Sequence, residues 1–127
     1  MPARVRLEHL AGTYAVGRLE PMSPIPVWAD GEGFVSISRS DDELSIVCRA
    51  ERIPSDVKQD TGWTCYKFIG PFAFDETGIV ANVIGPLSDA GIGIFVVSTF
   101  DGDHMLIKET DVAQAESVLD TAGHTLG

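Results

Sequence analysis

The chain has 127 residues, 44% of them apolar, and its 19 acidic against 9 basic side chains give a net charge of -10. Such an acidic chain repels nucleic acid and anionic membranes, so we expect neither as a partner. No apolar stretch approaches the roughly 20 residues of a membrane span, and the N-terminus does not read as a signal peptide. Cys48 and Cys65 lack a metal-binding spacing, so we expect free thiols in a cytoplasmic protein.

The first half predicts short strands separated by turns. Alternating apolar residues indicate strands at 4–9, 13–19, 34–38 and 46–47. Three prolines between residues 21 and 26 leave room only for a short helix around Trp28. A second short helix is predicted over residues 51–59, with Pro54 as a first helical residue. The polar stretch 60–62 is a turn signal and separates the two halves.

The second half begins with a predicted strand over residues 66–74, after which Asp75 can cap a helix. Apolar residues then recur at helical spacing from residue 79 to residue 90, and Gly91 is a natural stop. Pro86 lies inside this apolar stripe. Because proline lacks an amide proton, we expect the helix to kink or restart there.

A hairpin and a closing helix complete the second half. Strands are predicted over residues 94–99 and 104–108, around a turn at 101–103. Asp111 with Gln114 resembles a capping box, and the apolar spacing that follows predicts a helix ending at Gly123. The predicted order of elements is β-α-β-β-α.

The first half resembles a blurred copy of the second. A shift of 60 positions superimposes their apolar hairpin positions and places Asp41 on Asp101. We therefore expect an α+β protein with two βαββα units in tandem, over residues 1–61 and 62–127. Each unit would have an antiparallel sheet with helices on one face. The same likeness also arises between two unrelated hairpins, so duplication stays a prediction.

Two motifs carry a family resemblance. Asp75-Glu76-Thr77-Gly78-Ile79 lies at the predicted turn from strand to helix. Leu87-Ser88-Asp89-Ala90-Gly91-Ile92-Gly93-Ile94, followed by Phe95-Val96-Val97-Ser98-Thr99, lies at the next strand. In this order they resemble the ACT domain family, related to the ACT modules of CASTOR-type arginine sensors and aspartate kinases. Thr77 replaces the proline that many ACT units carry at the turn.

The resemblance implies ferredoxin-like units that regulate by binding a small molecule, typically an amino acid, where two ACT units meet. It implies a ligand site with Asp75, Thr77, Gly78 and Ile79 on the turn side and Ile92, Gly93 and Ile94 on the strand side. No enzymatic activity and no cofactor follow from it. We also expect a homodimer, because exposed sheet edges in small units seek partners.

The residues at the turn agree with this implication. The first amides of a helix lack internal partners and lie at the positive end of its dipole, so they suit a ligand carboxylate. Gly78 would let a ligand approach closely, although close packing of the helix on its sheet also explains a glycine there. Asp75 can accept from a ligand ammonium or cap the helix. Ile94 can bind a ligand only if its strand is an edge.

The sequence offers less support for dinucleotide binding, metal binding or catalysis. The glycines at 31, 33, 91 and 93 lack the third glycine and the preceding strand of a dinucleotide fingerprint. The histidines are scattered, so a metal site is not expected. No catalytic constellation is apparent. The main alternative is an assembly module, in which the same edges and helix faces only bind a partner protein.

Overall fold

A computed structural model describes residues 4–69 and 78–127 of this chain. The chain divides into two compact units, of which one combines Met1–Leu10 with Thr64–Gly127 and the other contains Ala11–Trp63. The first ten residues thus belong to the unit that we had expected to begin at residue 62. Within the described ranges, no helix is long and apolar enough to cross a membrane.

Strand β5 (Lys58–Ile69) belongs to both units and changes two predictions. Its first part pairs with β2 and its last part with β1. The predicted helix over residues 51–59 is therefore wrong, since this segment forms only a short 3-10 helix, η2 (Ala50–Arg52), before β5 begins. Residues 60–62 are not a turn between halves either. They lie in β5 where the register shifts, and Gly62 adopts a φ of +84°, as a bulge requires.

The unit of residues 11–63 is built from strands. It contains β2 (Tyr14–Leu19), β3 (Ser36–Arg39), β4 (Leu44–Arg49) and the start of β5, in the order β3-β4-β2-β5. Its helical segments are η2 and the 3-10 helix η1 (Val27–Ala29), which lies where a short helix was predicted. All residues of this unit are described, and none is α-helical. The expected βαββα order is therefore not repeated here, and its small core gathers around Leu44 and Ile46.

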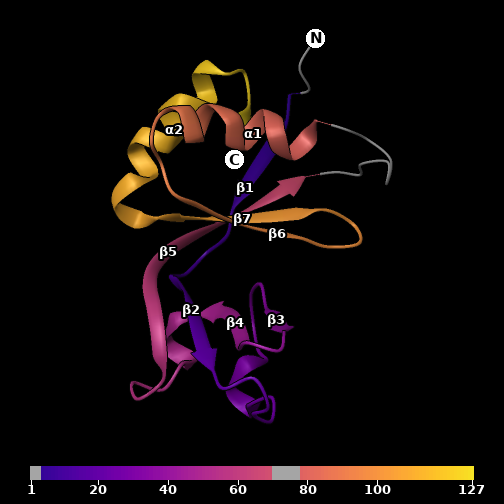
Figure 1. Ribbon diagram of the computed structural model, residues 1–127. Coiled ribbons are helices and arrows are strands. Elements are labelled where there is room, and N and C mark those ends of the chain that lie inside the picture. The colour runs from indigo at the N-terminus through magenta and orange to yellow at the C-terminus, as the bar shows by residue number, and fades with distance from the viewer. Residues whose placement is uncertain (1–3, 70–77) are drawn as a thin grey trace. The chain divides into compact units, whose positions relative to one another are not determined.

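The other unit has the predicted α+β composition. Its elements are β1 (Arg6–His9), the end of β5, α1 (Ile79–Asp89), β6 (Ile94–Ser98), β7 (Asp103–Lys108), η3 (Glu109–Asp111), α2 (Val112–Thr121) and β8 (Thr125–Leu126). The strand order is β6-β7-β5-β1-β8, with β8 parallel to β1. Both helices lie on the same side of these strands (Figure 1).

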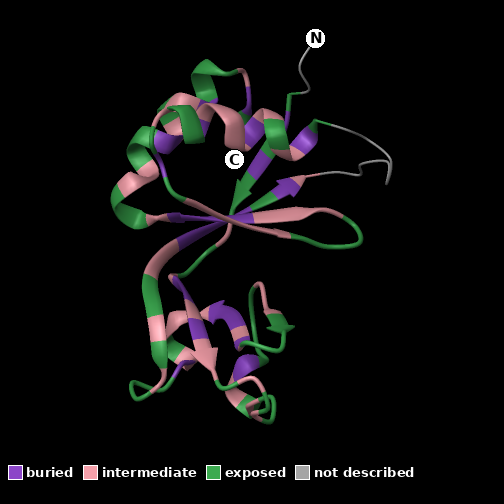
Figure 2. Ribbon diagram, viewed as in Figure 1, coloured by how far each residue is buried: buried purple, intermediate pink, exposed green. Residues whose placement is uncertain are grey.

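The core of this unit lies between the helices and the sheet. The predicted apolar stripe is confirmed, since Ile79, Val83 and Leu87 of α1 are buried against the strands. Figure 2 shows both helices with buried and exposed sides. The capping box at α2 is not formed. Asp111 makes no side-chain cap because η3 leads into the helix, so the backbone of Asp111 is already helical.

Helix α1 continues through Pro86 instead of restarting there. Proline has no amide proton for the carbonyl of Asn82, four residues earlier. The ring of His124 replaces it: His124 Nε2 lies 2.7 Å from the Asn82 carbonyl oxygen, and Nδ1 accepts the amide proton of Val5 at 3.0 Å. Since Nδ1 accepts, Nε2 carries the proton and donates it to Asn82. His124 is 5% exposed, so water cannot replace these bonds.

This arrangement predicts coupling between Pro86 and His124. The substitution H124F keeps a ring but leaves two buried backbone groups unpaired, which should lower the free energy of unfolding by about 2–4 kcal/mol. P86A supplies an amide to Asn82, so H124F should cost about 1 kcal/mol less in the P86A background. Urea unfolding of the four proteins of this cycle measures the coupling. Strictly additive effects would contradict the proposed replacement of one donor by the other.

Candidate functional site

The N-terminus of α1 presents amides that have no partner among the described residues. Gly78 is the N-cap, with a φ of +83°, and no side chain of residues 4–69 or 78–127 caps the helix. Its carbonyl accepts the amide proton of Asn82, whereas the amides of Ile79, Val80 and Ala81 have no acceptor among the described residues. These three donors lie at the positive end of the helix dipole. Amides in such a position can donate to an anion, and the anion-binding role of this turn stays a prediction.

The structure explains the glycine at position 78 by its backbone conformation and not by close packing. A Cβ atom there would lie 3.6 Å from Asn82 Nδ2 and would meet no other atom of the described residues within 4 Å. Neither close packing nor a tight approach therefore requires glycine. The positive φ does, because it disfavours residues with a Cβ. Asn82 reaches back to the same mouth of the helix and adds a polar side chain. Asp75 and Thr77, predicted for this side of the site, lie outside the described residues.

On the strand side, the open edge belongs to Ile94 and not to Ile92. The Ile92 amide donates to Leu87 O at 3.0 Å and so closes the end of α1. Strand β6 pairs with β7 alone among the described strands, with Ile94 opposite Ile107. Thr99 N donates to Gly102 O, and hydrogen-bonded pairs alternate along an antiparallel ladder.

This alternation turns the main-chain groups of Ile94, Val96 and Ser98 away from β7. Gly93, just before the strand, is exposed, and a Cβ atom added to it would have nothing within 4 Å. Val96 and Ser98 were not among the predicted site residues. The alternation of apolar residues could have identified a strand, but only the pairing register shows which amides face outward.

The two sides of the predicted site do not meet within one unit. Gly78 and Ile92 flank opposite ends of α1, whose 11 residues span about 16 Å at 1.5 Å per residue. Strand β6 starts at the end where α1 stops and runs back toward the end where α1 begins (Figure 1). One small ligand therefore cannot touch Gly78 and Ile94 of the same unit.

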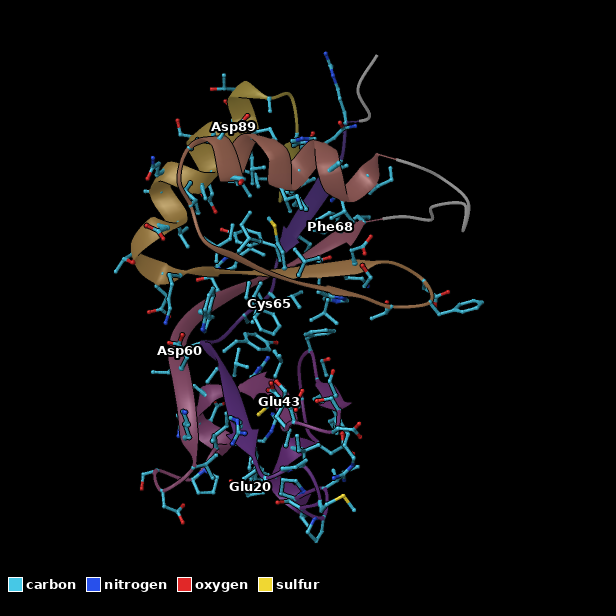
Figure 3. All side chains as sticks on the ribbon, in the orientation of Figure 1. Glu20, Glu43, Asp60, Cys65, Phe68 and Asp89 are labelled. Carbon is cyan, nitrogen blue, oxygen red and sulfur yellow. The ribbon has the colours of Figure 1, made fainter. Side chains whose placement is uncertain are left out.

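The two cysteines are not activated as nucleophiles. Cys48 and Cys65 are free thiols, as predicted, and both are buried. Burial raises the pKa of Cys65 to about 12 and also raises that of Cys48, which disfavours the nucleophilic thiolate. Figure 3 shows Cys65 within its strand. Among residues 4–69 and 78–127, no group of three or more His, Cys, Asp or Glu side chains is placed to hold a metal ion.

A family comparison identifies the unit that carries α1 and β6. A sequence model described as an ACT domain matches residues 59–121. The chain belongs to the ACT domain family. A second sequence model, described as an N-terminal domain, matches residues 12–56. This second match covers the segment in which the structure contains no α-helix.

Individual relatives agree with this assignment. Protein Atu0741 of Agobacterium tumefaciens is 60% identical, with 98% of this chain and 93% of that one covered and a TM-score of 0.95. The bovine "Cytosolic arginine sensor for mTORC1 subunit 1" is 35% identical over 102 residues, which are 74% of this chain and 31% of the sensor. The chain thus spans less than a third of the length of the arginine sensors it matches. Aspartate kinase of Clostridium acetobutylicum shares the fold, with a TM-score of 0.64 and 13% identity over 88% of this chain and 33% of that one.

Two glycines of α1 should respond oppositely to alanine. G78A places a Cβ at positive φ and should lower the free energy of unfolding by about 1–2 kcal/mol. G85A lies in the middle of the helix, where an added Cβ would have nothing within 4 Å, and should raise it by about 0.5–1 kcal/mol. Urea unfolding followed by circular dichroism measures both. Equal effects of the two variants would contradict a conformational role for Gly78.

His104 should make stability depend on pH. Burial, and next the nearby charge of Lys67, lower its pKa from the usual 6.5 in the fold. The unfolded chain therefore binds a proton first as the pH falls. Stability should be full above about pH 7 and should decrease as the pH falls below 6.5 through the folded pKa. Thermal melting between pH 7.5 and pH 5 tests this sign, and H104Q should have the shallower dependence. Identical slopes for H104Q and the wild type would exclude His104 as the cause.

Proposed function

We propose that this protein is a regulatory module that binds an amino acid, with the ligand held between two copies of the ACT unit. The turn side of each site would be the mouth of α1 from one copy, at Gly78, together with Asp75 and Thr77. The strand side would be the edge of β6 from the other copy, at Ile94, with Ile92 and Gly93 beside it. The protein would not be an enzyme and would need no cofactor.

The observation that carries the proposal is a set of main-chain groups at these two places that have no partner in the described part of the chain. Three amides at the mouth of α1 suit a ligand carboxylate. The outward carbonyl and amide of Ile94 suit the ligand's ammonium and carboxylate. The 16 Å or so between the ends of α1 explains why two copies are needed.

A two-fold axis brings the required groups together. If the β6 edges of two copies face each other antiparallel, with the ligand between them in place of direct pairing at Ile94, the Ile94 end of one strand lies beside the Ser98 end of the other. In each unit that Ser98 end is on the side where α1 begins (Figure 1). The mouth of α1 in one copy is then near Ile94 of its partner. This arrangement is isologous, so it would create two equal sites per homodimer.

The relatives support the ligand class and the compartment. The arginine sensors are named as cytosolic proteins that sense an amino acid, and the aspartate kinase is described as an allosteric enzyme. We therefore extend a cytoplasmic location and an amino acid ligand to this chain. The alternative is an assembly module, since an open β6 edge is sufficient for pairing without a ligand.

A charge change at Ala81 separates binding from folding. Ala81 is exposed in the first turn of α1. In A81E the new carboxylate should stabilise the helix but repel a ligand carboxylate, whereas A81K should do the reverse. Titration calorimetry against each of the twenty amino acids, at concentrations up to about 1 mM, should find one that binds. A81E should weaken it at least tenfold while raising the melting temperature, and A81K should not weaken it.

Two results would count against the proposal, one against an amino acid ligand and one against its site at α1. If none of the twenty binds while light scattering finds a dimer, the alternative of an assembly module holds. If A81E and A81K weaken binding equally, the ligand does not use the positive end of α1.

A further inference from the structure

Strand β3 forms an open edge in the unit of residues 11–63. It is the last strand in the order β3-β4-β2-β5 and, among the described residues, pairs with β4 alone. Three of its four residues are exposed, as Figure 2 shows. Natural edge strands commonly carry charged residues, above all lysine, or proline against unwanted pairing. The sequence of this strand, Ser36-Ile37-Ser38-Arg39, contains no lysine and no proline, and its one charged side chain, Arg39, binds the carbonyls of Pro21 and Ser23.

The register shows which main-chain groups are available. Ser40 N donates to Glu43 O at 2.9 Å, so this pair is hydrogen-bonded. Alternation along the ladder makes Ser38 with Ser45 the next bonded pair and leaves Ile37 opposite Ile46 as a non-bonded pair. The amides and carbonyls of Ile37 and Arg39 therefore point away from β4, where another strand can bind them.

On the face that holds the core, β3 carries Ile37 and Arg39, of which Ile37 is the apolar one. Ile37 lies opposite the buried Ile46 and is itself 40% exposed. A strand added to β3 would extend this face and cover Ile37. The segment before η1 is held near β3 by Arg39, whose guanidinium donates to the carbonyls of Pro21 and Ser23. Met22, between these two residues, is 87% exposed.

The charge of this region selects the partner. The turn after β3 carries Asp41, Asp42 and Glu43, and Glu20 lies next to the crossing segment. Figure 3 labels two of these four acids, Glu20 and Glu43. The region also carries two arginines, Arg18, which pairs with Glu20 and the carbonyl of Asp42, and Arg39, which among the described residues binds only carbonyls. Four carboxylates against two guanidinium groups leave an excess of negative charge. A second copy of this chain would bring the same acidic turn to this edge, so it is a poor match here.

We propose that the β3 edge binds an extended segment of a partner protein in which basic and apolar residues alternate. The segment pairs with the outward groups of Ile37 and Arg39 and forms an additional strand. Its apolar side chains cover Ile37 and Met22, and its basic side chains face Asp41 and Asp42. This surface is distinct from the α1 and β6 groups of the proposed amino acid site.

The probe is the capped peptide Lys-Val-Lys-Val-Lys-Val, titrated calorimetrically at about 0.15 M salt, where the Debye length is about 8 Å. The capped peptide Lys-Lys-Lys-Val-Val-Val has the same composition and charge without the alternation. The alternating peptide should bind at least tenfold more tightly than this control. I37P removes one outward amide but no ladder bond, and should weaken binding at least tenfold. I37V keeps the amide and should bind like the wild type.

Amide exchange tests the same contact without a substitution. In the free protein the amides of Ile37 and Arg39 should exchange rapidly, and the alternating peptide should slow both, whereas Ser38, already in the ladder, should change little. Equal binding of the two peptides, or unchanged exchange at Ile37 and Arg39, would overturn the proposal. So would sedimentation showing that I37P dissociates a dimer, because the occupant would then be a second copy.

Discussion

The unit that contains α1 depends on one buried imidazole. His124 accepts the amide proton of Val5 and donates to the carbonyl of Asn82, which Pro86 leaves without its helical partner. One ring thereby connects the two ends of the chain to the middle of the first helix. Thr125, the next residue, donates to the carbonyl of Val5, so the same contact starts the parallel pairing of β8 with β1. A proline that would otherwise weaken α1 is in this way part of how α1 is fixed to the sheet.

The position of α1 determines what the unit can bind. Its core side is buried and held at Asn82, whereas Gly78 and Ala81 at its N-terminus are exposed, and Gly78 turns the chain into the helix without a side-chain cap from the described residues. The same helix leads through Ile92 into β6, and the Ile92 amide is used to end α1. The first residue of this segment with outward main-chain groups is therefore Ile94. The separation of the two binding surfaces follows from the length of one helix.

The apolar periodicity of the sequence predicted those elements whose type depends on burying one face. The stripe of α1, the hairpin of β6 and β7, and the α2 helix were predicted because their buried residues recur at fixed spacing. The helix expected over residues 51–59 failed for a physical reason. Pro54 and the polar residues after it are compatible with a helix start, but the edge of β2 that does not pair with β4 is paired by the start of β5. At Gly62 the local signal for a turn was real, yet the long-range pairing converts it into a bulge. Such choices depend on a strand far away in the sequence.

The candidate sites were less predictable than the fold because they consist of backbone. Gly78 was identified by its place before a helix, although its function there, positive φ, differs from the close approach that glycine suggested. Ile94 and Ile37 look alike in the sequence, as aliphatic residues in short strands. What distinguishes each is that its pair across the ladder is a non-bonded one at an open edge. A change of one residue in register would turn the same amides inward. Recognition by main-chain groups therefore depends on the register of strand pairing, and side-chain motifs alone do not specify it.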